Sequence, residues 1–166
     1  VEDPTHPENV DALLEIAQST SIPIATGERN TTRWGFREIC EKRAAAVLQP
    51  DIRHCGGILE MRKIASLAEI HYLSIAPHSA SDPLGVVASV HAMAGVPNFL
   101  IQEYGGGNGE ELFHEPLTFQ DGFVELPEGP GMGVTIDEQK LEALRITEWG
   151  QRSSRRHPED DSVNDI

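Results

Sequence analysis

The sequence predicts an α/β fold of parallel strands and helices, corresponding to the C-terminal portion of a (β/α)8-type, TIM-like barrel. Short apolar segments alternate with amphipathic segments of helical period, which indicates parallel strands joined by crossover helices. The apolar segments are centred near residues 1, 24, 48, 74 and 100, a spacing of 23 to 26 residues that suits one barrel unit. Because a closed barrel needs eight strands and about 250 residues, the five strands expected in this 166-residue chain predict part of a barrel.

The elements of this part follow one another along residues 1–104. The first helix is predicted from Val10, Leu13 and Ala17, which share one face of a helical segment. The last begins at Asp82-Pro83, since Asp is a good N-cap and Pro suits the first helical position. Helices are expected over residues 9–20, 32–43, 58–71 and from 82 onward. Strands are expected over residues 1–4, 21–26, 46–49, 72–76 and 98–102.

The character of the sequence changes at residue 105. Residues 105–150 open with a glycine-rich loop, and Gln120-Asp121-Gly122 is a hairpin-type turn signal within residues 117–126. A short helix is expected over residues 137–144. We expect residues 105–150 to pack back on the barrel or on a capping region. Residues 151–166 carry runs of like charge and are expected to form a disordered tail.

Charge and composition exclude several classes of partner. The chain has 27 acidic and 13 basic residues and a formal charge of −14, which argues against nucleic acid or an anionic membrane as the partner. Its apolar stretches are far shorter than the roughly 20 residues that span a bilayer. The first residues do not form a basic and then apolar leader, so secretion is not expected. Cys40 and Cys55 are too few for a disulfide framework, so we expect reduced thiols and a cytoplasmic protein.

One polar residue closes each predicted strand. These residues are Glu2, Glu28, Asp51, His78 and Glu103, and their separations are 26, 23, 27 and 25. The C-terminal ends of barrel strands converge on one mouth, so these side chains are expected to face a common cavity. Four carboxylates in one cavity need a balancing cation or protons, and oxygen ligands suit Mg²⁺. Any one of them taken alone is better explained as a solvated loop charge; the periodic set is what predicts a site.

Short motifs around these residues resemble the enolase superfamily. They are Val1-Glu2-Asp3-Pro4, Ala25-Thr26-Gly27-Glu28-Arg29, Gln49-Pro50-Asp51, Cys55-Gly56-Gly57-Ile58, Ala76-Pro77-His78 and Ile101-Gln102-Glu103. The order and separation of the motifs resemble the C-terminal barrel region of mandelate racemase/muconate lactonizing enzymes. The branch to which the chain is most similar is that of the galactonate dehydratase-like acid-sugar dehydratases, over residues 1 to about 146. The resemblance implies a partial chain of a carbon–oxygen lyase.

The resemblance also implies roles for the residues. Glu2 and Glu28 would be two of three Mg²⁺ ligands, and we expect them to lie close enough to share one cation. Asp51 and His78 would form a hydrogen-bonded dyad in which His78 protonates a departing β-hydroxyl, since histidine titrates near neutral pH. Glu103 would hydrogen-bond the developing enediolate. The substrate would be a small-molecule sugar acid (an aldonate) and the product a 2-keto-3-deoxy acid.

Two further residues have open interpretations. His54 lies near the predicted mouth and is a candidate substrate-binding residue, although a loop hydrogen bond explains it at least as well. Arg29 beside Glu28 either binds substrate or pairs with the metal carboxylates.

Several features leave the activity itself open. The third metal carboxylate and the general base of the family are expected upstream of Val1, and the family's capping region has no counterpart here. After His78 the chain has Ser79-Ala80-Ser81-Asp82, where relatives more often show Asn or Cys followed by Pro. A racemase or epimerase with the same dyad is one alternative, and a truncated, non-catalytic assembly piece is another. We expect the isolated chain to be inactive and to require the missing part of the barrel or a homo-oligomer for stability.

Overall fold

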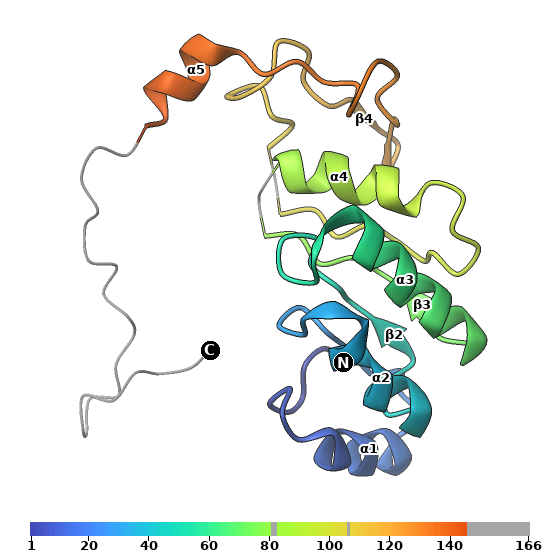
Figure 1. Ribbon diagram of the computed structural model, residues 1–166. Helices are drawn as coiled ribbons and strands as arrows, with labels where there is room; N and C mark the ends of the chain where they lie inside the picture. Colours follow the sequence, from blue (N-terminus) through green and yellow to red (C-terminus); the bar gives the residue numbers. More distant parts are fainter. Residues whose placement is uncertain (81–82, 106, 146–166) are drawn as a thin grey trace, which may run out of the picture.

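The computed structural model describes residues 1–80, 83–105 and 107–145 (Figure 1). The α-helices are α1 (Val10–Ser19), α2 (Thr32–Lys42), α3 (Gly57–Ile70), α4 (Pro83–Met93) and α5 (Glu138–Ala143). The strands are β1 (Ala25–Thr26), β2 (Val47–Leu48), β3 (Ser74–Ile75), β4 (Phe119–Gln120) and β5 (Phe123–Val124). The predicted alternation of helices and strands is confirmed, and each predicted helix other than the one from Asp82 agrees with its observed bounds to within a residue or so. Asp82 itself lies outside the described residues.

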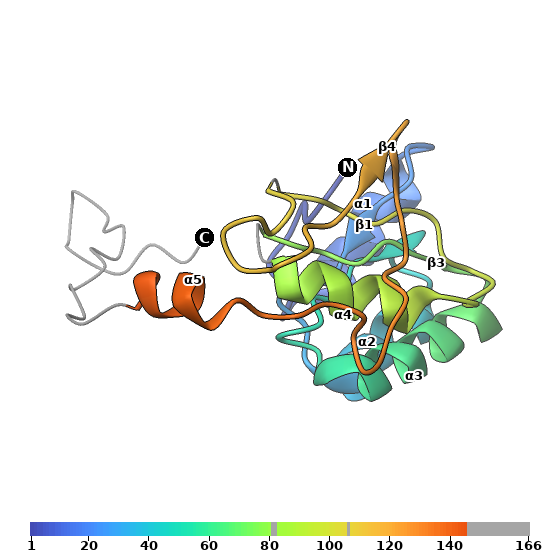
Figure 2. The ribbon, with the colours of Figure 1, turned by 90° about the horizontal axis from the view of Figure 1, so that it is seen from above.

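Strands β1, β2 and β3 form one parallel sheet in chain order. Ala25 pairs with Val47, and Val47 pairs in turn with Ser74. Helices α2 and α3 connect these strands, and α2, α3 and α4 lie side by side in chain order on one side of the sheet (Figures 1 and 2). The arrangement is that of consecutive (β/α) units, which confirms the predicted parallel α/β class.

The outermost predicted strands are shorter than expected. Residues 1–4 contribute a single parallel bridge, between Glu2 and Ala25, and residues 98–102 contribute one between Phe99 and Ile75. In the described part of the chain, each of these segments is bridged to a neighbour on only one side. The expected five strands are therefore three strands flanked by two bridged segments in the described part of the chain.

The main core lies between the sheet and the helices. It is built from the inward faces of α2 and α3 and from the buried residues of the strands. The largest fully buried side chains of this cluster are Phe36, Ile39, Leu48, Met61, Ile64 and Ile75. Phe36 also shapes the end of β1, because a Cβ at Gly27 would lie 2.6 Å from its ring. Gly27 has a φ of +137°, so the turn that presents Glu28 requires glycine for both its backbone angle and its space.

The chain after residue 105 packs on α4. Phe113 and Leu117 are buried against Val86 and Val87 of that helix. The predicted turn at Asp121-Gly122 joins β4 and β5 in an antiparallel hairpin, and Asp137 caps α5 with its side chain. Figure 1 shows this segment beyond α4, at the opposite end of the stack from α1. The division into residues 1–104, 105–150 and 151–166 stays a prediction, and the expected disordered tail lies outside the described residues.

Within the ranges described above, every helix is too short or too polar to cross a membrane.

Candidate active site

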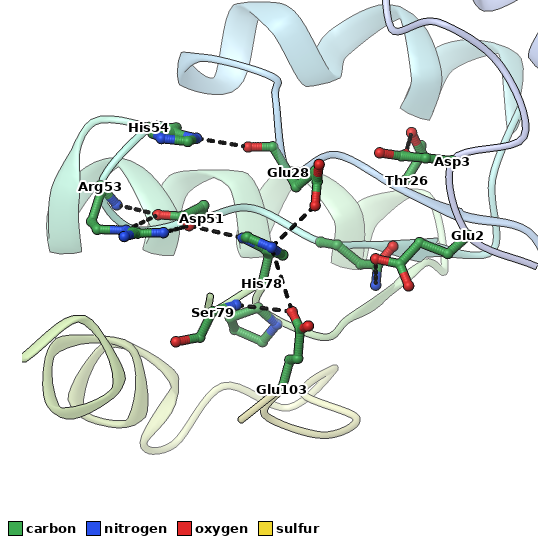
Figure 3. Close-up of polar contacts among 12 residues, drawn as sticks. Glu2, Asp3, Thr26, Glu28, Asp51, Arg53, His54, His78, Ser79 and Glu103 are labelled. Atoms are coloured by element: carbon green, nitrogen blue, oxygen red, sulfur yellow. Dashed lines mark hydrogen bonds and ion pairs between the residues drawn. The ribbon is translucent and has the colours of Figure 1, made fainter. Parts of the chain in front are cut away.

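Four of the predicted site residues meet at the C-terminal ends of the strands. Glu28 follows β1, Asp51 follows β2 and His78 follows β3, while Glu103 follows the segment bridged to β3. Asp51 and His78 form a parallel bridge that continues the sheet past β2 and β3. Figure 3 shows the four side chains pointing toward one another, and we call Glu28, Asp51, His78 and Glu103 the strand-end cluster.

Asp51 is a buried carboxylate held by several donors. Its residue is 1% exposed. Oδ2 accepts hydrogen bonds from His78 Nδ1 at 2.8 Å and from Arg53 Nη2 at 2.7 Å. Oδ1 accepts from the Arg53 backbone N–H at 2.7 Å and from Arg53 Nε at 3.1 Å. Burial raises the pKa of Asp51, but the hydrogen bonds from Arg53 and His78 outweigh it and hold the pKa at about 2. Asp51 is therefore an anion that can only accept hydrogen bonds.

The contacts of His78 assign different tasks to its two ring nitrogens. Because the ionised Asp51 only accepts, Nδ1 carries the hydrogen of the 2.8 Å bond, as predicted for the dyad. Nε2 faces the other carboxylates, 3.0 Å from Glu28 Oε2 and 3.8 Å from Glu103 Oε2. The Ser79 backbone N–H donates to Glu103 Oε2 at 2.9 Å and fixes that carboxylate beside the ring. Nε2 is thus the nitrogen from which a proton can move to or from a bound molecule.

Glu2 does not join the contacts around His78. It is exposed, and its Oε1 accepts a hydrogen bond from Gln49 Nε2 at 3.1 Å. The bridge between Glu2 and Ala25 places Glu2 beside the strand that leads to Glu28. The predicted sharing of one cation by Glu2 and Glu28 stays a prediction.

His54 and Arg29 lie next to the cluster without contacting His78. His54 is exposed, and its Nδ1 is 3.1 Å from the backbone oxygen of Glu28, which ties the loop after β2 to the loop after β1 (Figure 3). This is the loop hydrogen bond that the sequence left open. Arg29 is half-buried, and its Nε is buried without a hydrogen-bond partner among the described residues. Substrate binding by either residue stays a prediction.

The donor chemistry of the site fits a hard cation in part. Glu2 and Glu28 offer carboxylate oxygens from neighbouring strand ends, which are the ligands that Mg²⁺ prefers. Glu28 is also the ion-pair partner of His78, so its carboxylate has two competing uses. In the part of the chain that the structure describes, no group of three or more His, Cys, Asp or Glu side chains is arranged to hold a metal ion. That Glu2 and Glu28 serve as metal ligands stays a prediction.

Sequence reasoning missed three residues that organise the cluster. Each of them donates a hydrogen bond to a carboxylate. Arg53 donates to Asp51, the Gln49 side chain to Glu2, and the Ser79 backbone N–H to Glu103. A signal existed for Arg53, since an Asp often bonds the backbone N–H two residues later in a turn. The contacts of Gln49 and Ser79 join segments 47 and 24 residues apart in sequence and had no local signal.

Comparison with known proteins places this arrangement in a family. Residues 1–140 match the family described as "Enolase C-terminal domain-like". The chain is 41% identical over 149 residues to a D-xylonate dehydratase of Haloferax volcanii, covering 88% of this chain and 36% of that protein. It is 35% identical over 150 residues to a D-galactonate dehydratase of Variovorax paradoxus, covering 85% of this chain and 39% of that one.

Solved structures agree with this result. A mandelate racemase/muconate lactonizing enzyme from Sulfitobacter is 35% identical, with a TM-score of 0.83, over 90% of this chain and 38% of that one. The chain thus spans little more than a third of the length of the relatives it matches. The predicted resemblance and the predicted barrel portion are confirmed, and the chain belongs to the enolase C-terminal domain-like family.

Proposed function

We propose that this chain is the C-terminal barrel portion of a Mg²⁺-dependent acid-sugar dehydratase. The proposal rests on the contacts of the two ring nitrogens of His78. Nδ1 is hydrogen-bonded to the buried Asp51 anion, and Nε2 faces Glu28 and Glu103. A histidine held in this way is built to transfer a proton at Nε2. Relatives named D-xylonate dehydratase and D-galactonate dehydratase support a sugar acid as substrate and loss of water as the reaction.

The proposed reaction begins with removal of the proton α to the substrate carboxylate. By family resemblance the base belongs to a strand that precedes these residues in a longer chain. The electron pair left on the α carbon spreads onto the carboxylate as an enediolate. The carboxyl group of Glu103, held by the Ser79 N–H, would donate a hydrogen bond to that group in its protonated form. His78 then gives its Nε2 proton to the β-hydroxyl oxygen. The carbon–oxygen bond breaks, water leaves, and the resulting enol becomes a 2-keto-3-deoxy acid.

Glu2 and Glu28 are the residues proposed to hold the cation. When bound, Mg²⁺ would supply positive charge that stabilises the negative charge developing on the substrate carboxylate. Glu28 Oε2 lies 3.0 Å from His78 Nε2. The carboxylate of Glu28 would therefore contact both His78 and the cation, or exchange one for the other. Release of His78 by Glu28 would leave Nε2 available to the β-hydroxyl.

One experiment tests the reaction class in the enzyme that joins this chain to the rest of its barrel. Aldonic acids are incubated with this enzyme and Mg²⁺, and the 2-keto-3-deoxy acid formed is measured by a reaction of its keto group. His78→Asn should lower turnover by about 10² to 10⁴-fold, as expected for loss of a general acid, with Mg²⁺ affinity nearly unchanged. Glu28→Gln should weaken Mg²⁺ binding measured by calorimetry, whereas His6→Asn, at an exposed histidine, should change neither quantity.

The other outcomes separate the alternatives. Exchange of the α proton with deuterated solvent without keto-acid formation would indicate a racemase or epimerase, in which the dyad moves a proton but no hydroxyl leaves. Absence of both turnover and exchange would favour a non-catalytic piece. Full dehydratase turnover by His78→Asn would show that His78 is not the acid.

We also propose that the protein works in the cytoplasm as a homo-oligomer. The described cysteines, Cys40 and Cys55, are both free and buried, as expected in a reducing compartment. Large apolar side chains are exposed on and beside α3, including Leu59 at 67%, Ile70 at 73% and Tyr72 at 90%, which supports association. Sedimentation of the protein would test the assembly.

A further inference from the structure

We propose that Arg53 is a positioning residue that holds the carboxylate of Asp51 in the orientation in which it accepts the Nδ1 hydrogen of His78. The functional meaning of this inference rests on the proposed dehydratase reaction. The geometric claim concerns only Arg53, Asp51 and His78 and can be tested without substrate.

Three hydrogen bonds run from Arg53 to the carboxylate of Asp51. The backbone N–H and Nε of Arg53 both reach Oδ1, at 2.7 and 3.1 Å, while Nη2 reaches Oδ2 at 2.7 Å. The guanidinium plane and the carboxylate therefore form a two-pronged pair, which fixes the rotation of the carboxylate as a single hydrogen bond cannot. Figure 3 shows Asp51 between Arg53 and His78.

The same contacts argue against substrate binding as the main task of Arg53. An arginine at the edge of a site for sugar acids would ordinarily be expected to pair with the substrate carboxylate. Here Nε and Nη2 are already directed at the oxygens of Asp51. The Asp51 side chain that these bonds reach is 1% accessible, whereas 40% of the Arg53 side chain is accessible. Arg53 is thus suited to act through Asp51.

The orientation of Asp51 decides how the ring of His78 is held. Oδ2 accepts from Arg53 Nη2 at 2.7 Å and from His78 Nδ1 at 2.8 Å, so a rotation of the carboxylate would break both bonds. With Oδ2 in place, Nδ1 donates to Asp51 and the ring presents Nε2 to Glu28 and Glu103. Without the two side-chain bonds from Arg53, the carboxylate can rotate, and the Nδ1 hydrogen loses its fixed acceptor.

The experiment is NMR of ¹⁵N-labelled histidine rings in the enzyme that joins this chain to the rest of its barrel. His78→Gln identifies the signals of His78 by their disappearance. The wild type should show the Nδ1–H of His78 as a signal protected from exchange with water, since Asp51 holds that hydrogen. Arg53→Gln should broaden or lose this signal, and guanidinium ion added to it should restore part of it. Arg37→Gln removes an exposed arginine that pairs with Glu41 on α2, and it should leave the signal unchanged.

Arg53→Lys keeps the positive charge but loses the two-pronged pair, and it decides the question if Arg53→Gln does not fold. We expect a partial loss of the protected Nδ1–H signal of His78. An unchanged Nδ1–H signal in whichever of the two variants folds would overturn the inference. This result is independent of turnover by His78→Asn, so failure of the dehydratase proposal and failure of the Arg53 proposal are told apart.

Discussion

Replacing Asp51 by asparagine should destabilise the folded chain by roughly 2 to 3 kcal/mol at neutral pH. The carboxylate has a pKa of about 2 in the fold against an ordinary value of 3.8, because the donors from Arg53 and His78 outweigh the effect of burial. The difference is about 1.8 pH units, and each unit corresponds to about 1.4 kcal/mol. Asp51 is 1% exposed, so solvent does not screen these contacts appreciably.

The pH dependence has a definite sign. The folded pKa is depressed, so the unfolded chain binds the proton more readily than the folded chain. The stabilising contribution of Asp51 is therefore complete above about pH 4 and is lost as the pH falls from about 4 to about 2. Asparagine has no proton to bind, so the Asp51→Asn chain should lack this part of the acid sensitivity. The free energies of unfolding of the two chains should converge near pH 2.

The measurement is urea denaturation followed by far-UV circular dichroism, repeated from neutral pH to about pH 2 in both chains. Glu41→Gln is the matched control, since Glu41 is exposed and its contact with Arg37 is a surface ion pair. Such pairs contribute about 0 to 1 kcal/mol, so that variant should follow the wild-type curve closely. If the Asp51→Asn and wild-type curves run parallel through the acid range, the argument from the contacts of Asp51 is wrong.

The remaining predictions concern packing, charge and completeness. Gly109→Ala should cost about 1 to 3 kcal/mol more than Gly122→Ala in urea denaturation, because both have a φ near +80° but only the Cβ at Gly109 would meet Phe113, at 2.5 Å; equal losses would contradict this. Phe36→Ala should cost roughly 3–5 kcal/mol, since Phe36 is fully buried, and a loss below about 1 kcal/mol would be inconsistent with that burial. Raising NaCl from about 0.01 to 1 M should increase the urea midpoint, because a net charge of −14 repels itself and salt screens that repulsion; a lower midpoint would refute the reasoning. The 166-residue chain alone should form no measurable 2-keto-3-deoxy acid with excess Mg²⁺, since its described residues supply only two of the proposed ligands; turnover by a monodisperse monomer would disprove this and direct attention to His54 as a base.

The sequence by itself determined the order of the elements and the residues that meet at the strand ends. Apolar strands at regular spacing imply parallel pairing, and parallel strands bring their C-terminal ends to one edge. A single polar residue at the end of each unit therefore predicted that Glu2, Glu28, Asp51, His78 and Glu103 gather, before any distance was known. The last four do, whereas Glu2 bonds Gln49 and does not join the contacts around His78. The hairpin at Asp121-Gly122 was predictable for a similar reason, since its turn depends on adjacent residues.

Only the tertiary structure decided which donor reaches which acceptor. Arg53 donates to Asp51, Gln49 donates to Glu2, and Glu28 pairs with His78. Residues 1–4 and 98–102 form single bridges in place of strands. These outcomes depend on loop backbone angles, on side-chain rotamers and on whether a segment has a neighbour on both sides. Periodicity carries none of that information, because it records which face or end a residue occupies and not the direction of its polar atoms. The spacing of polar residues thus located the site, and the packing of loops and side chains determined its hydrogen bonds.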